Sequence, residues 1–152
     1  MPLLYTSVKF IHILLAIAAV GFNASYGVWL SRAAQNPPAA GLLLRGVQFM
    51  DNRIANPAYG LLLLTGLAMV FTAGIPITTF WIAAATILWL IAIVWGAAMY
   101  TPTLRRQIET LDAKGFDSPE FQQLSRRGTI IGLVNMVPIL LILIMMVFKP
   151  TL

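Results

Sequence analysis

The chain has 152 residues, of which 59% are hydrophobic and only 10% are charged, and its formal net charge is +5. Ordinary soluble domains carry about 25% charged residues, and a small domain leaves too much surface exposed to hide this much apolar area from water. The composition therefore favours an integral membrane protein. The chain contains no cysteine, which excludes disulfides, thiolate metal sites and cysteine nucleophiles.

Four apolar stretches approach the length of about 20 residues that a transmembrane helix needs. They cover residues 5–31, 57–73, 79–101 and 128–148. We predict an all-α, polytopic membrane protein, a four-transmembrane-helix bundle that forms one domain over residues 1–152. The first stretch stays apolar as far as Leu30, beyond the apolar core of a signal peptide, so we interpret it as a retained helix.

Two ionisable residues interrupt the first span near its outer end. Lys9 and the only histidine, His12, are three residues apart and share a helical face. Lys149 ends the fourth span, and the three groups converge if these two helices are neighbours. Two interpretations stay open. The lysines reach to lipid headgroups beside a hydrogen-bonded histidine, or the three groups form a site for an anionic headgroup, a carboxylate, a quinone or haem.

Haem is an alternative with a specific restriction. One histidine supplies one axial ligand, so a second ligand has to come from another copy of the chain or from a methionine. We therefore expect no cofactor as the first hypothesis, with haem at His12 as the alternative. No His-rich or carboxylate motif predicts a metal site.

The connection "GLLLRGVQFMDNRIANP" has the pattern of an amphipathic helix. Leu43, Val47 and Met50 fall at steps of four and three, while Arg45 lies on another face. We expect this helix to lie on the membrane or against the bundle. Pro57, which lacks a backbone donor, is expected to kink or break it where the second span begins.

The second and third spans are joined by "AGIPIT", a short connection with two helix breakers. We expect these spans to form an antiparallel hairpin. The longer connection after Tyr100 contains another amphipathic helix that carries Leu104 and Ile108 on one face and ends at Gly115. Ser118 is a suitable N-cap for a helix that runs into the fourth span. The acidic residues are expected to be solvated in these connections: Asp51, Glu109, Asp112, Asp117 and Glu120.

One asparagine lies in the first span and one in the fourth, at similar depth in the membrane. Asn23 and Asn135 are both expected on the cytoplasmic side of the midplane, where they could hydrogen-bond across the bundle. Such bonds contribute about 0.6 kcal/mol in membranes. We favour helix packing over a transport site for this pair.

The basic residues predict an orientation. Eight of the ten lysines and arginines lie in the two longer connections, and only Lys9 and Lys149 lie at the other side. Because cytoplasmic loops are enriched in lysine and arginine, we expect these connections in the cytoplasm and both termini on the periplasmic side of a bacterial inner membrane. Basic residues spread between apolar runs predict contact with the lipid bilayer and no nucleic-acid partner.

Four segments carry a resemblance to a known family: "KFIHILLA", "NPAYGLLLLTGLAM", "LSRRG" and the terminal "MMVFKP". Together and in this order they resemble a bacterial family of predicted integral membrane proteins of unknown function. The resemblance implies four spans in the inner membrane and no biochemical activity. Lys9 and His12 also resemble a pair in haem-associated membrane families, including copper-resistance membrane proteins, but the further histidines and acidic residues of those families are missing.

The chain shows no catalytic constellation of residues. Our first hypothesis is a non-enzymatic protein that acts through a protein partner, a lipid or a small hydrophobic ligand, with a homo-oligomer or a membrane-protein partner as the forms of association. The alternatives are a haem-binding or redox protein centred on His12 and a small transporter component.

Overall fold

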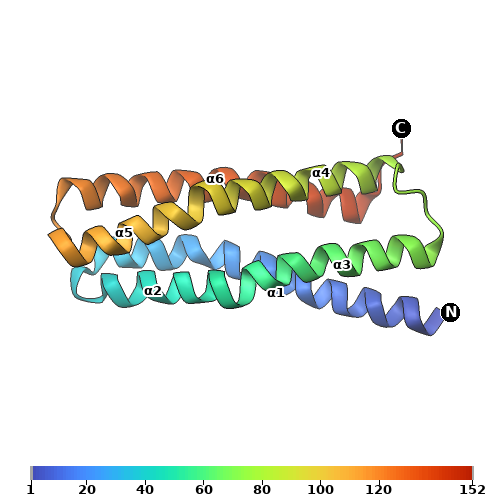
Figure 1. The fold of residues 1–152 in the computed structure, drawn as a ribbon, viewed down its shortest axis with the longest axis horizontal. Coiled ribbons are helices and arrows are strands. Elements are labelled where there is room, and N and C mark those ends of the chain that lie inside the picture. The colour runs from blue at the N-terminus through green and yellow to red at the C-terminus, as the bar shows by residue number, and fades with distance from the viewer. Residues whose placement is uncertain (1, 152) are drawn as a thin grey trace.

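The computed structural model describes residues 2–151, and Figure 1 shows them as a bundle of long helices lying side by side. The α-helices are α1 (Pro2–Gln35), α2 (Ala40–Met50), α3 (Asn56–Ala73), α4 (Phe80–Trp95), α5 (Thr101–Lys114) and α6 (Pro119–Phe148). A 3-10 turn, η1 (Pro37–Ala39), and two π turns, η2 (Asp51–Ala55) and η3 (Gly96–Tyr100), lie between them. The predicted all-helical fold is confirmed.

The bundle consists of four long helical segments. Two of these are α1 and α6, and the other two combine elements, because α2 runs through η2 into α3 and α4 runs through η3 into α5. Each of the four segments is long and apolar enough to cross a membrane. The amphipathic connecting helices are therefore extensions of the second and third spans beyond their apolar parts.

Of the kink or break expected at Pro57, the break does not occur, because the chain accommodates this proline with a π turn. In η2 the Asn56 N–H bonds the Asp51 carbonyl, five residues earlier, and Pro57 then occupies the first turn of α3, where no donor is needed. The chain repeats this solution at η3, which ends at Tyr100, so that Pro102 lies in the first turn of α5. Such π turns occur frequently at functional sites.

The four segments pack as two pairs. Helix α1 lies along α3, and α4 lies along α6, while α1 with α6 and α2 with α5 connect the pairs. The loop that joins α3 to α4 lies at the same end as both termini (Figure 1). Helices α3 and α4 are antiparallel, as expected for a hairpin, although α3 packs mainly against α1 and α4 mainly against α6.

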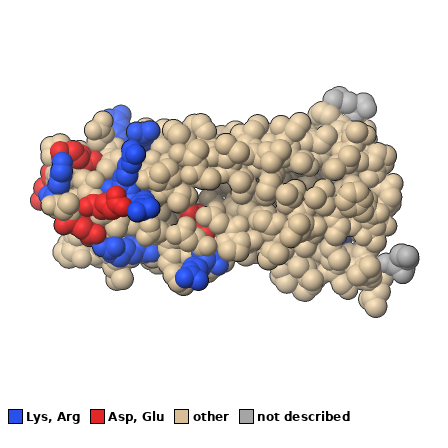
Figure 2. All heavy atoms as spheres, viewed as in Figure 1, with Lys and Arg blue, Asp and Glu red and all other residues tan. Residues whose placement is uncertain are grey.

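The tightest packing is at the opposite end of the bundle, around α2 and α5. The largest fully buried side chains, Phe121, Leu44 and Val47, all lie there, and Figure 2 shows that the charged side chains gather over the same end. Val47 is fully buried, so the amphipathic α2 packs against the bundle, which was one of the two expected positions. Leu104 and Ile108 of α5 are buried on the predicted face.

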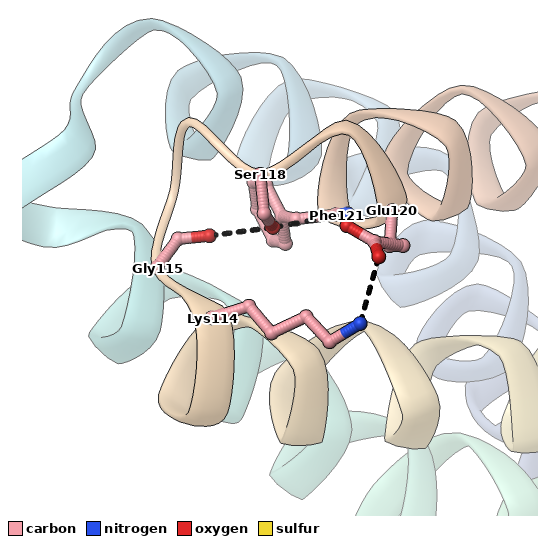
Figure 3. A network of polar contacts seen from close by, with 5 residues as sticks. All are labelled: Lys114, Gly115, Ser118, Glu120 and Phe121. Carbon is pink, nitrogen blue, oxygen red and sulfur yellow. Dashed lines mark hydrogen bonds and ion pairs between the residues drawn. The ribbon is translucent and has the colours of Figure 1, made fainter.

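The turn between α5 and α6 has the predicted chemistry (Figure 3). Gly115 has a φ of +81°, which favours glycine, and it ends α5. The Ser118 hydroxyl accepts a hydrogen bond from the Phe121 N–H at 3.4 Å and donates one to the Gly115 carbonyl at 2.9 Å. Lys114 Nζ lies 2.7 Å from Glu120 Oε1 across the turn. Ser118 is thus the N-cap of α6.

Replacing Ser118 tests this cap. We expect Ser118→Ala to lower the free energy of unfolding by about 1 kcal/mol, because the Phe121 N–H loses its acceptor. Ser118→Asp, which keeps a side-chain acceptor, should stay close to the wild type. Thermal unfolding in detergent measures both variants, and equal destabilisation by alanine and aspartate would contradict the capping role.

Candidate functional site

A large cavity separates the two helix pairs at the end of the bundle that holds the termini. Its volume is about 680 Å³, and its walls come from α1, α3, α4 and α6. Ligand pockets in proteins typically have volumes of about 300–1,000 Å³. The walls are mainly apolar, with side chains such as Leu63, Leu67, Trp89, Ile142 and Leu143. We call this space the outer cavity.

The outer cavity brings together three of the residues singled out in the sequence. Lys9 and His12 of α1 and Lys149, at the end of α6, all line it. The Lys149 ammonium lies 5.4 Å from the centroid of the Trp81 ring, within the range of a cation–π contact. Both lysines are exposed and His12 is half-buried. Two positive charges and an imidazole therefore border an otherwise apolar space.

The hydrogen bonds of His12 indicate which ring nitrogen carries its proton. Nδ1 lies 2.7 Å from the Thr65 hydroxyl, and that hydroxyl donates its one hydrogen to the Leu61 carbonyl at 2.8 Å. With the hydroxyl hydrogen directed to Leu61, Thr65 accepts from Nδ1–H, and the Leu62 carbonyl is a further acceptor on α3 for the ring. This network assigns the proton to Nδ1 and leaves the Nε2 lone pair available as a ligand or acceptor.

Gly66 allows the His12 ring to lie close to α3. A Cβ atom at this position would be 3.3 Å from His12 Cε1, closer than normal side-chain contacts. Any larger residue would therefore push the ring away from α3. Thr65 and Gly66 are adjacent in "NPAYGLLLLTGLAM", and together they fix the place and the orientation of His12.

A second, smaller cavity lies deeper in the bundle, and we call it the inner cavity. It has a volume of about 30 Å³, and both Asn23 and Asn135 line it. The sequence suggested that the two asparagines could hydrogen-bond each other, but each has a different environment. Asn23 Nδ2 donates to the Tyr59 hydroxyl at 3.1 Å, whereas Asn135 Oδ1 is buried without a partner. Tyr59 lines both cavities and lies between them.

Asp51 also lines the inner cavity, and its expected exposure to solvent is wrong. Its side chain is only 6% exposed, and Asp51 Oδ2 accepts a hydrogen bond from Asn56 Nδ2 at 3.3 Å. The other four carboxylates are exposed, as expected. A sequence signal was present, since Asp51 follows Leu44 and Val47 at helical steps of three and four on the buried face.

Between residues 2 and 151, no group of three or more histidine, cysteine, aspartate or glutamate side chains is placed to hold a metal ion. The polar residues that sequence reasoning missed are Thr65, which binds His12, and the three buried tyrosines around Asp51. These tyrosines are Tyr26, Tyr59 and Tyr100, and each interacts electrostatically with the Asp51 carboxyl group.

The comparisons with known proteins add one finding. Residues 6–150 match the sequence model of a family described as predicted integral membrane protein (DUF2269). No curated protein and no solved structure matches the chain. The family match covers all four spans and both cavities.

Because the chain has a single histidine, its ring nitrogens give one set of NMR signals. We expect Thr65→Val to change the two ¹⁵N shifts, since the Nδ1–H tautomer loses an acceptor, whereas Thr65→Ser should preserve them. Protein labelled with ¹⁵N-histidine in detergent micelles provides the measurement. Unchanged histidine signals in the valine variant would contradict the assigned hydrogen bond.

Proposed function

We propose a ligand-binding function for this chain, which belongs to the DUF2269 family of predicted integral membrane proteins. The ligand is an amphiphile with an apolar body and an anionic group, and it occupies the outer cavity. The observation that carries this proposal is a cavity of about 680 Å³ with apolar walls and two lysines at its border.

The size of the outer cavity argues that it is filled. The outer cavity is partly open at the surface of the bundle, so lipid or another apolar molecule can enter it from a surrounding membrane. An apolar cavity of about 150 Å³ already binds a molecule such as benzene, and the outer cavity is several times larger. In a bilayer, an acyl chain or a similar apolar molecule restores the van der Waals contacts that the walls otherwise lack.

The two lysines at the border of the outer cavity favour a ligand with an anionic polar end. Lys9 and Lys149 are cations, and among residues 2–151 neither forms an ion pair with a carboxylate. A carboxylate or phosphate between them would form charge-assisted hydrogen bonds. Among residues 2–151, no aspartate or glutamate lines the outer cavity, so the charges of these residues at its border favour an anion.

Haem is a second candidate, because the His12 network favours it. A metal-binding histidine usually donates its other ring N–H to a nearby acceptor, as His12 Nδ1 does to Thr65. Met146 lines the same cavity and could be a further iron ligand, while Lys9 and Lys149 would pair with the propionate groups. His12 Nε2 would then hold the iron, and the apolar walls would limit the access of water to it.

We also propose that the chain lies in a bacterial inner membrane with the charged end in the cytoplasm. Seven lysines and arginines belong to the end formed by α2, α5 and the adjoining ends of α1 and α6, and an eighth, Arg53, lies in the neighbouring η2. The outer cavity, with both termini, then lies in the periplasmic half of the bilayer. A ligand would reach it from the outer leaflet.

The ligand proposal predicts that an anionic amphiphile copurifies with the chain in mild detergent. The double variant Lys9→Gln, Lys149→Gln should retain about tenfold less of it, because each lost ionic hydrogen bond weakens binding. Lys114→Gln, at the opposite end, is the matched control. Native mass spectrometry with lipid analysis provides the measurement, and equal retention in all three proteins would contradict the proposal.

The haem candidate makes a separate prediction. Protein purified from haem-supplied cells should show a Soret band that His12→Ala abolishes, while the folded yield in size-exclusion chromatography is unchanged. A colourless wild-type protein that still carries an anionic amphiphile would eliminate haem and leave the first proposal standing.

Fusions test the orientation. We expect alkaline phosphatase fused after Leu152 to be active, because that enzyme works only outside the cytoplasm, and a fluorescent protein that matures only in the cytoplasm to be dark. A fusion inserted after Gly115 should give the opposite result. A bright cytoplasmic reporter after Leu152 would overturn the orientation.

A further inference from the structure

The inner cavity is built from all four helical segments, at the level where the two π turns lie. Its polar lining comes from Asn23, Asp51, Asn56, Tyr59, Tyr100, Thr101 and Asn135. Asp51 is the first residue of η2, and Tyr100 is the last residue of η3. The two π turns thus contribute oxygen-bearing side chains to one small space from opposite helix pairs.

Asp51 is a buried acid without a basic partner. Its side chain is 6% exposed, and between residues 2 and 151 it forms no ion pair with lysine, arginine or histidine. The groups that interact with it, Asn56, Thr101 and the three tyrosines, are all neutral. A buried charge without a counter-charge is strongly unfavourable, so either a proton or a cation from outside the protein has to neutralise the Asp51 carboxylate.

Two further oxygen atoms at the inner cavity have no hydrogen-bond partner within residues 2–151. Tyr100 is 7% exposed, and its hydroxyl is buried without a hydrogen bond, as is Asn135 Oδ1. Buried polar atoms in proteins almost always have a partner. Both residues line the same space of about 30 Å³ as the Asp51 carboxyl group. The unpartnered oxygens and the unbalanced charge therefore coincide.

We propose that the inner cavity binds one alkali-metal cation. Asp51 supplies the charged ligand, and Asn135 Oδ1 and the hydroxyls of Tyr100 and Thr101 supply neutral oxygen ligands. Hard cations prefer such carboxylate, carbonyl and hydroxyl oxygens. One carboxylate balances one positive charge, whereas calcium sites in proteins usually use several carboxylates.

The volume agrees with a single small cation. A water molecule needs about 10–15 Å³ of accessible space, so the inner cavity of about 30 Å³ holds an ion of that size and little else. Asn56 is exposed at its edge, which provides a route from the surface. The stacked rings of Tyr26 and Tyr100, with centroids 6.2 Å apart, pack beside the site and keep the Tyr100 hydroxyl in place.

Thermal unfolding of the full chain in detergent tests this proposal. At constant ionic strength, NaCl or KCl should raise the unfolding temperature relative to choline chloride, with a saturable dependence on the cation. At a concentration a hundredfold above the dissociation constant, the expected rise is about 5 °C. Asp51→Asn should abolish the rise, and Asp112→Asn, which alters an exposed carboxylate, should retain it.

Three results would overturn the proposal. They are equal unfolding temperatures in all three salts, a cation response that persists in Asp51→Asn, and a stability that depends on pH but not on the cation, which would show that a proton neutralises Asp51. If Asp51→Asn does not fold, wild-type protein still gives an answer. Radioactive sodium or rubidium should bind it saturably with one ion per chain, and Asn135→Ala should weaken that binding about tenfold.

Discussion

The packing between the two helix pairs is the interaction on which the rest of the structure depends. In lipid, apolar helix surfaces gain little by leaving the solvent, so helices associate where side chains interlock or polar groups bond. The buried core is concentrated around α2, α5 and the first half of α6, beside the charged end. At the other end only α1 with α3 and α4 with α6 pack closely, and the pairs separate.

Both cavities follow from this uneven packing. The outer cavity occupies the space where the pairs separate, and the inner cavity lies where they converge around the π turns. Tyr59 belongs to both, and its hydroxyl and carbonyl are held by Asn23 and Trp89. The hydrogen-bonded Tyr59 therefore lies between a mainly apolar space and a smaller, more polar one.

The sequence predicted what depends on local patterns. The four spans, the Ser118 cap and the buried faces of α2 and α5 follow from apolar runs, spacing and capping chemistry, and each is confirmed. The π turn before Pro57 and the burial of Asp51 were missed, because both depend on which helix packs against which. For the same reason the sequence predicted that Lys9, His12 and Lys149 converge only on the condition that the first and fourth spans are neighbours. Their role in binding stays a prediction.

The account rests on an outer cavity that has room for a ligand, and a pair of matched substitutions tests this most directly. Ala85 and Ala33 are both 2% exposed, but Ala85 lines the outer cavity and Ala33 lies in the packed core. The measurements are size-exclusion chromatography and lipid analysis. Ala85→Trp should be folded but without its amphiphile, because the indole fills the cavity. Ala33→Trp should misfold, because the packed core has no room for the larger side chain. Equal misfolding of the two variants, or an Ala85→Trp protein that keeps its ligand, would contradict the account.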